Sequence, residues 1–381
     1  MATPEIAICV TTYQKPWHLR RVLASIAGQQ GVEGRLEVAV TDDGSTDDTP
    51  EIVEQFRRRV DFPVRFTTHE HTVFHPARCR NDGARATSAP YLLFVDGDCV
   101  LPPDHVAIHL ARRRPGYVML GFCFRVSKEL SDGLTEEGAR HGEFLAWDVG
   151  RERRLVARRH RKARLYCLLR HPSKPRLASG NFGIWRTDFE RVNGFDENYR
   201  GWGQEDDDLG RRLRRAGIRF DSILGWTQTY HLWHPPDPSA PKDWRNGPNV
   251  PYFSRRAWLA RCRQGLVTRP ASDLAIQTVG RPATPDRVTQ LWRETGRPNR
   301  ANAFPSPAGM PPEVEILFTP SDGRFSKTAP FQVLVALDDA PPSARLLRQA
   351  NLIVSDRQFD GLNGTPQFPL SEFRQALDSI A

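Results

Sequence analysis

Tyr91-Leu-Leu-Phe-Val-Asp-Gly-Asp98 is a short apolar run that ends in two carboxylates one residue apart. A continuous apolar run of this length predicts a strand buried on both faces, as in a parallel sheet. Similar runs precede it, with stretches of helical periodicity between them: strands are expected at 6–12, 36–40 and 64–67, and helices at 17–26, 50–59 and 77–88. This alternation predicts an α/β fold with a mostly parallel central sheet and right-handed crossovers.

Polar residues follow three of the four expected strands. The clusters are Thr11 to Tyr13, Asp42 to Ser45 and Asp96 to Asp98. In open parallel sheets, ligands bind beyond the carboxyl ends of the strands. The sequence therefore predicts a ligand site at this edge of the sheet.

Asp96 and Asp98 point to the same side of an extended backbone, because side chains alternate along a strand. Two negative charges held this close need a compensating cation, and a hard divalent metal ion that also binds a diphosphate would supply it. An Asp-x-Asp pattern is common in surface turns, and its position after a buried strand is what favours a site. A neutral imidazole from His231 or His234 would complete the metal shell, and we favour His231 with His234 close behind.

Other residues near these strand ends suit a nucleotide. The carboxylate of Asp43 would accept hydrogen bonds from a nucleobase or a ribose, Tyr13 would stack on a flat base, and Arg80 would meet a phosphate through two parallel hydrogen bonds. Exposed Tyr and Arg are frequent in any protein, so the combination indicates function more than any one of them.

Four consecutive acids, Glu205 to Asp208, precede Leu209 and Leu213 at helical spacing. The helix dipole favours one or two acids in a first turn, and four exceed that need. A carboxylate at a helix start beside a metal site is well placed as the general base toward an acceptor hydroxyl. Trp202, just before the acids, offers an apolar platform for a sugar ring.

As an ordered set, these motifs resemble the family 2 nucleotide-sugar glycosyltransferases of the Rossmann-like GT-A fold. The matching segments are Val10–Lys15, Val40–Asp47, Cys79–Gly83 and Phe94–Asp98, and the segment from Asn193 to Asp208 is similar to the acceptor segment of β-1,4-galactosyltransferases and bacterial chondroitin-type polymerases. The resemblance covers about residues 5 to 236. It implies an inverting, metal-dependent transfer of a hexose or N-acetylhexosamine from a UDP-sugar to a hydroxyl of a glycan or glycolipid acceptor, in bacterial-type surface polysaccharide synthesis.

The resemblance also assigns roles to positions. It implies that Thr11, Tyr13 and Asp43 hold the uridine, that Arg80 and Asp96 serve the ribose and diphosphate, and that Asp98 binds Mn²⁺ or Mg²⁺ with His231 or His234. By the same resemblance Asp206 is the catalytic base, Glu205 and Asp207 orient donor or acceptor, and Trp202 contacts the acceptor. Gln204 stands where the family usually has Gly, which bears on the acceptor pocket.

Length and composition set the outer limits. The 381 residues are 39% hydrophobic and 26% charged, which is typical of a globular chain of about two domains. We expect a glycosyltransferase domain at 1–236, a Pro-rich linker or wrapping arm at 237–312 and a small α/β appendage at 313–381. Six scattered cysteines without a Cys-x-x-Cys pair, and a start without a signal-like segment, favour a reduced, cytoplasmic protein.

The formal net charge of +9 is unevenly spread, and eleven Lys and Arg between Arg151 and Arg176 face one acid, Glu152. A solvated helix face is the plain interpretation, and peripheral contact of 151–176 with an anionic membrane at its inner face is the functional one. Two alternatives to a glycosyltransferase stay open at this stage: a basic protein that binds nucleic acid or another anionic surface, and a nucleotidyltransferase on a related sheet. The first leaves the acids at the strand ends unexplained, so we expect no nucleic-acid partner.

Overall fold

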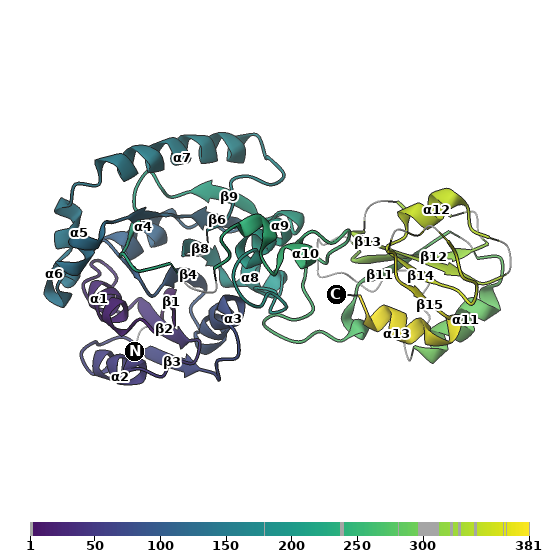
Figure 1. Ribbon diagram of the computed structural model, residues 1–381, viewed down its shortest axis with the longest axis horizontal. Coiled ribbons are helices and arrows are strands. Elements are labelled where there is room, and N and C mark those ends of the chain that lie inside the picture. Colours follow the sequence, from purple (N-terminus) through teal and green to yellow (C-terminus); the bar gives the residue numbers. More distant parts are fainter. Residues whose placement is uncertain are drawn as a thin grey trace. The chain divides into compact units, whose positions relative to one another are not determined.

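The structure, a computed structural model, describes residues 3–178, 180–236, 240–280, 282–295, 312–320, 323–326, 329–338, 341–360, 362 and 364–380. It divides into two compact units, Met1–Phe253 and Ser254–Ala381 (Figure 1). No helix in these described stretches has the length and apolar character needed to cross a membrane.

Unit 1 is built on a seven-stranded mixed sheet whose first four neighbouring strands run parallel and whose strand β8 runs antiparallel to both neighbours. This confirms the predicted α/β class with a mostly parallel sheet. In spatial order the strands are β3 (Val64–Thr68), β2 (Leu36–Asp42), β1 (Ile6–Thr12), β4 (Tyr91–Asp96), β8 (Asn181–Trp185), β6 (Tyr117–Leu120) and β9 (Arg219–Ser222).

Helix α1 (Pro16–Ala27) shows why helices cover this sheet, because it buries one apolar stripe. In α1, Leu19, Val22, Leu23 and Ile26 recur at three- and four-residue spacing and are buried, and Pro16 occupies the first turn, where its missing N–H costs nothing. The other helices of unit 1 are α2 (Thr49–Arg57), α3 (Pro76–Ala86), α4 (His105–Arg112), α5 (Lys128–Asp132), α6 (Glu136–His141), α7 (Gly150–Leu168), α8 (Arg186–Arg191), α9 (Glu205–Arg215) and α10 (Val250–Phe253).

The register of the central strands places the three polar clusters side by side. Thr11 of β1 aligns with Thr41 of β2 on one side and with Asp96 of β4 on the other. Gly97 donates its N–H to the Thr11 carbonyl over 2.8 Å, and a Cβ on Gly97 would lie only 2.8 Å from the same oxygen. A glycine between the two aspartates thus allows the β4 end to lie against β1.

A small three-stranded sheet carries the chain back to this edge. Its order is β5 (Cys99–Val100), β10 (Thr229–His231) and β7 (Cys123–Arg125). His231 pairs with Cys99, and the Leu232 N–H donates to the Asp98 carbonyl over 2.9 Å. Main-chain pairing thereby brings the second half of unit 1 beside Asp98.

The boundary between the units lies at 253/254, further along the chain than the predicted boundary at 236/237. Tyr252 donates to Asp196 over 2.9 Å and Asn249 donates to the Gly203 carbonyl over 2.9 Å, so the chain up to 253 contacts unit 1. The rest of the predicted arm contributes β11 (Ile276–Val279) and α11 (Pro285–Glu294) to unit 2. Positions 237–239, 281 and 296–311 of that arm lie outside the described residues.

Unit 2 holds a five-stranded, all-parallel sheet in sequence order, with apolar side chains alternating between two buried faces. Its remaining elements are β12 (Val314–Thr319), β13 (Phe331–Ala336), β14 (Leu352–Val354), β15 (Gln367–Phe368), α12 (Ala344–Gln349) and α13 (Phe373–Asp378). This agrees with the small α/β character expected of the C-terminal extension.

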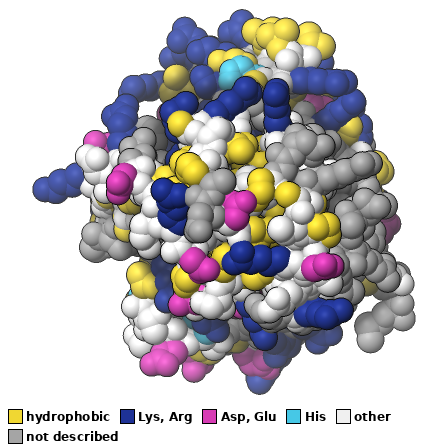
Figure 2. Space-filling view, turned by 90° about the vertical axis from the view of Figure 1, so that its right-hand side faces the viewer, with side chains coloured by type: hydrophobic (Ala, Val, Ile, Leu, Met, Phe, Trp, Pro, Cys, Tyr) yellow, Lys and Arg dark blue, Asp and Glu magenta, His cyan; other side chains and the backbone are white. Residues whose placement is uncertain are grey.

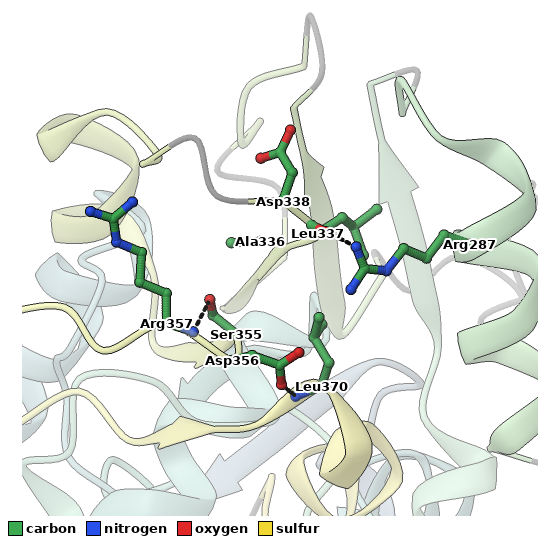
Figure 3. A pocket seen from close by; sticks show the side chains of 8 residues that line it. All are labelled: Arg287, Ala336, Leu337, Asp338, Ser355, Asp356, Arg357 and Leu370. Carbon is green, nitrogen blue, oxygen red and sulfur yellow. Dashed lines mark hydrogen bonds between the residues drawn. The ribbon is translucent and has the colours of Figure 1, made fainter.

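A cavity of about 720 Å³ opens at the carboxyl edge of the unit 2 sheet (Figure 3). Four charged side chains surround it, Arg287 from α11 and Asp338, Asp356 and Arg357 from the loops after β13 and β14. All four are exposed. Arg287 donates to the Leu337 carbonyl, and Asp356 accepts the Leu370 N–H over 2.8 Å.

Candidate active site

Asp98, His231 and His234 converge at the carboxyl edge of the unit 1 sheet. His231 Nε2 lies 3.6 Å from Asp98 Oδ1, and His234 Nε2 lies 3.2 Å from Asp98 Oδ2. One ligand atom from each residue lies within 4.8 Å of the other two. One carboxylate and two imidazoles at this spacing fit a divalent cation, so both candidate histidines are placed for the role that the sequence left undecided.

Lys15 also reaches this group. Its Nζ lies 2.7 Å from Asp98 Oδ2 and 2.9 Å from His234 Nε2. The ammonium therefore supplies the positive charge that the buried Asp98 carboxylate requires. Burial raises the pKa of Asp98, but the hydrogen bond from His234 and the charges of His231 and Lys15 outweigh it and hold that pKa well below its usual range.

Arg80, on α3, links Asp96, at the end of β4, to the acidic start of α9. One arm of its guanidinium donates to Asp96 Oδ1 over 3.1 Å, and the other donates to Glu205 Oε1 over 3.1 Å. Arg80 is only 5% exposed. The fork of a single buried side chain thus holds the end of β4 and the start of α9 at one edge of the sheet.

Glu205 is buried and Asp206 beside it is half-buried, and the charged forms of both are disfavoured. Burial and the neighbouring Asp206 raise the pKa of Glu205 to about 7. Burial and the neighbouring Asp207 raise the pKa of Asp206 to about 6. A carboxylate with a pKa in this range is a stronger base than an exposed Asp and still ionises at neutral pH.

The four consecutive acids at the start of α9 differ in their contacts. Asp208 is fully buried and accepts from Arg212 over 2.6 Å and from Arg211 over 2.9 Å, which makes it a structural residue of α9. Asp207 faces Arg176, with 3.3 Å between its Oδ2 and an Nη of that side chain. Glu205 Oε2 is buried without a hydrogen-bond partner among the described residues.

Gln204 and Trp202 lie in the turn that leads into α9. Gln204 caps the helix with a φ of 76°, a left-handed conformation that favours glycine, the residue usual at this place in the resembling family. The ring of Trp202 is 37% exposed. Asn249 donates to the Gly203 carbonyl over 2.9 Å and to the Trp202 carbonyl over 3.4 Å, so it supports this turn from outside.

The three residues expected to hold the uridine, Thr11, Tyr13 and Asp43, lie at the carboxyl ends of β1 and β2. Tyr13 already stacks on His71, with ring centroids 4.3 Å apart and an interplanar angle of 11°. Asp43 is 1% exposed, and its carboxylate accepts from His69 over 2.8 Å and from the His75 N–H over 3.0 Å. The Thr11 hydroxyl is buried without a hydrogen-bond partner in the described part of the chain.

The carboxylate of the neighbouring Asp42 stabilises the loop that follows β2. Its carboxylate accepts from the Ser45 N–H, the Ser45 hydroxyl and the Thr68 hydroxyl over 2.6–2.8 Å. Gly44, between them, has a φ of 81°, and a Cβ there would meet the backbone of His69 and His71. The glycine thus permits a close approach of two protein loops.

Asp43, His69 and Cys79 form a second group whose ligand atoms lie within 4.8 Å of one another. Cys79 is fully buried, and burial together with Asp43 raises its thiol pKa well above the usual range. A protonated thiol is a poor metal ligand. Asp98 with its two histidines is therefore the better cation site of the two.

Several residues of this site gave no sequence signal that pointed to it. Lys15 and the three histidines at 69, 71 and 75 lie in loops, and their partners are far away in the sequence. Asn249 falls in the segment expected as linker. Only the concentration of histidines between 69 and 75, directly before the expected third helix, could have drawn attention to that loop.

Two parts of unit 1 match the sequence models of known protein families. Residues 7–153 match the sequence model of glycosyl transferase family 2, and residues 159–235 match that of the N-terminal domain of galactosyltransferase. The match to glycosyl transferase family 2 thus covers the N-terminal part of the chain, and the match to the galactosyltransferase model follows it. The resemblance seen in the motifs is thereby confirmed, and both matches end inside unit 1.

Named relatives are similar to part of this chain. Validoxylamine A glucosyltransferase of Streptomyces hygroscopicus subsp. limoneus is 30% identical over 239 residues, which cover 56% of this chain and 49% of the relative. Chondroitin synthase of Escherichia coli is 26% identical over 282 residues, covering 66% of this chain and 39% of the relative. The chain thus spans about half, or less, of the length of these relatives. A crystal structure of Staphylococcus aureus TarS 1–349 in complex with UDP-GlcNAc is 17% identical, with a TM-score of 0.42 over 61% of this chain and 60% of that one.

Proposed function

We propose that the protein is an inverting, metal-dependent glycosyltransferase that moves a hexose or N-acetylhexosamine from a UDP-sugar to a hydroxyl of a glycan or glycolipid acceptor. The observation that carries the proposal is the fork of Arg80 between Asp96 and Glu205. It holds the end of β4, two residues before the cation donor Asp98, and the acids of α9 at one edge of the sheet. A transfer reaction needs both, because one set binds the leaving group and the other activates the acceptor.

The residues that would hold the metal are Asp98, His231 and His234. When bound, the cation neutralises negative charge on the departing diphosphate. Imidazole nitrogen suits Mn²⁺ better than Mg²⁺, which prefers oxygen ligands and retained water. We therefore favour Mn²⁺ over Mg²⁺. Lys15 would have to leave Asp98 Oδ2 to make room, and its ammonium is then available to a phosphate oxygen.

The donor nucleotide would lie along the ends of β1, β2 and β4. Tyr13 and the unpartnered hydroxyl of Thr11 border the place for the uridine. Asp43 would accept from the base only by sharing a carboxylate that His69 and the His75 N–H already contact. We propose that these contacts orient the carboxylate toward the base. Asp96 would bind the ribose, with its other oxygen held by Arg80.

Asp206 would act as the general base. Its carboxylate takes the proton of the acceptor hydroxyl while that oxygen bonds to the anomeric carbon. The bond from the anomeric carbon to the phosphate oxygen breaks, and its electron pair leaves with UDP. Because attack and departure occur on opposite faces, one displacement inverts the anomeric configuration. Glu205 positions Arg80, whereas Trp202 and Asp207 would contact the acceptor.

One screen with two readouts tests the proposal. A screen of nucleotide sugars with Mn²⁺, read as thermal stabilisation and as release of UDP, should single out a UDP-sugar. Asp61→Asn, on an exposed loop, serves as the control variant. The absence of stabilisation by any nucleotide sugar, with and without metal, would refute the assignment. A cytoplasmic location stays a prediction of the sequence.

A further inference from the structure

Helix α7 carries a stripe of basic side chains on the face turned away from the rest of unit 1. Arg151, Arg154, Arg158 and Arg161 recur at three- and four-residue spacing and are exposed. Val156 and Ala163, on the opposite face, are buried. The helix runs along unit 1 beyond β9 (Figure 1), and Lys and Arg side chains gather along the upper edge of Figure 2, where α7 lies.

This stripe is not balanced by acids. Among the described residues no ion pair engages any of its four arginines or the adjacent Lys162. Like charges at this spacing repel and lower the stability of a helix, and arginines in the first turn oppose the helix dipole. An anionic surface outside the protein would relieve both effects.

Exposed leucines continue the stripe at the C-terminal end of the helix. Leu165 is 52% exposed and Leu168 is 80% exposed, and Leu169, directly after the helix, is 65% exposed. Large apolar side chains this open to water are unusual when they lie together. A helix face that passes from arginine to leucine is amphipathic along its length, with charge at one end and apolar surface at the other.

We propose that this stripe, Arg151 to Leu169, docks unit 1 on an anionic lipid surface, with the arginines at the headgroups and the leucines inserted among the acyl chains. Basic residues near such a surface gain electrostatic attraction, and apolar side chains gain by leaving water. Nucleic acid would satisfy the arginines but would leave the leucines exposed. The leucines therefore decide between the two partners in favour of the membrane.

The chain after the leucines leads directly to the candidate active site. Arg176 pairs with Asp207, and Arg214 of α9 donates to the Pro175 carbonyl. Leu177 is buried. A lipid-bound Leu165–Leu169 end would thus bring the acids of α9 near the headgroup layer. Lipid docking would favour a glycolipid as the acceptor, and this conclusion about the acceptor rests on the proposed function.

The test is sedimentation of the full chain with mixed phosphatidylglycerol–phosphatidylcholine vesicles and with pure phosphatidylcholine vesicles. We expect binding to the mixed vesicles only, weakening with added salt. The triple variant Arg154→Glu, Arg158→Glu, Arg161→Glu should weaken it on the order of a hundredfold. The control variant Arg58→Glu, Arg59→Glu, Arg65→Glu changes the net charge equally, directly after α2 and in β3, and should keep most of the binding.

The triple variant Leu165→Ser, Leu168→Ser, Leu169→Ser should weaken vesicle binding about tenfold or more. If charge reversal unfolds the protein, Arg154→Gln, Arg158→Gln, Arg161→Gln replaces it. Equal binding to both kinds of vesicle, or equal loss in the α7 and control variants, would overturn the proposal. The proposal would also be overturned if the leucine variant bound vesicles as well as wild type does and the wild-type protein bound duplex DNA more tightly than vesicles. UDP binding with Mn²⁺ is measured on the same variants, so failure of lipid docking is distinguished from failure of the proposed function.

Discussion

The edges where the parallel strands of the two units end use the same residue types in opposite ways. In unit 1, Arg80, Asp98 and Glu205 are buried. In unit 2, Arg287, Asp338, Asp356 and Arg357 surround an exposed cavity (Figure 3). Burial raises the energetic cost of each charge, so the unit 1 groups depend on one another and their pKa values shift. Topology thus provides the edge in both units, whereas burial shifts the pKa values of its residues in unit 1.

The largest expected effect is on the transfer rate, which should depend on an acid at the unit 1 edge and not on one at the unit 2 edge. Asp206→Asn should lower the transfer rate by about 10³-fold or more, because the amide cannot accept the proton, while UDP binding with Mn²⁺ stays within about twofold of wild type. Rates are measured as UDP release and binding by calorimetry. Asp338→Asn at the unit 2 edge is the matched control, and similar rates in both variants would remove Asp206 from the base role.

A second test concerns the metal. Asp98→Asn should weaken Mn²⁺ binding by about a hundredfold, because a neutral amide replaces the only charged ligand, and EDTA should abolish UDP binding in wild type. Mn²⁺ binding is followed by the loss of the free-ion electron paramagnetic resonance signal. Asp356→Asn should leave this titration unchanged, and an equal effect of the two variants would contradict the contrast between the edges.

Arg80→Lys tests whether the fork itself matters. Lysine keeps the charge but cannot donate to Asp96 and Glu205 in the same geometry, so we expect a loss of about 1–3 kcal/mol in the free energy of unfolding and weaker UDP binding. Arg287→Lys, in the exposed cavity, should change stability by less than about 0.5 kcal/mol. Denaturant titrations compare the two, and a larger effect at 287 would reverse the expected order.

A smaller effect is expected in the pH dependence. Asp206 must be ionised to accept a proton, so kcat/KM should rise with pH through about 6, the pKa that burial and Asp207 give it. Asp207→Asn removes a neighbouring negative charge, which lowers the pKa of Asp206 and moves the rising limb to lower pH. A limb that stays in place, or that moves to higher pH, would show that another group controls the rate.

The positions of the strand ends could be predicted from the sequence because local periodicity fixes them. Thr11, Asp43 and Asp96 each follow a buried apolar run, and parallel pairing then aligns their strands. Which acid of α9 is structural could not be predicted, because the four acids form one uninterrupted run. Only the packing of Arg211 and Arg212 distinguishes Asp208.

Residues that approach through loops were missed for a similar reason. Lys15 reaches Asp98 across 83 positions, and His69 reaches Asp43 across 26. No local pattern records such approaches. The unit boundary at 253/254 depends in the same way on side-chain contacts, those of Asn249 with the turn before α9 and of Tyr252 with Asp196. Prolines between 235 and 312 indicate a break in regular structure but not which unit each part joins.

The most direct test is a manganese anomalous difference map from crystals grown with Mn²⁺ and UDP. The account predicts a single strong peak at bonding distance, about 2.0–2.3 Å, from Asp98 and at least one of His231 and His234, with the diphosphate between that peak and Arg80. A peak at Asp43, His69 and Cys79 instead, or a diphosphate remote from the start of α9, would contradict the claim that cation and base share one site.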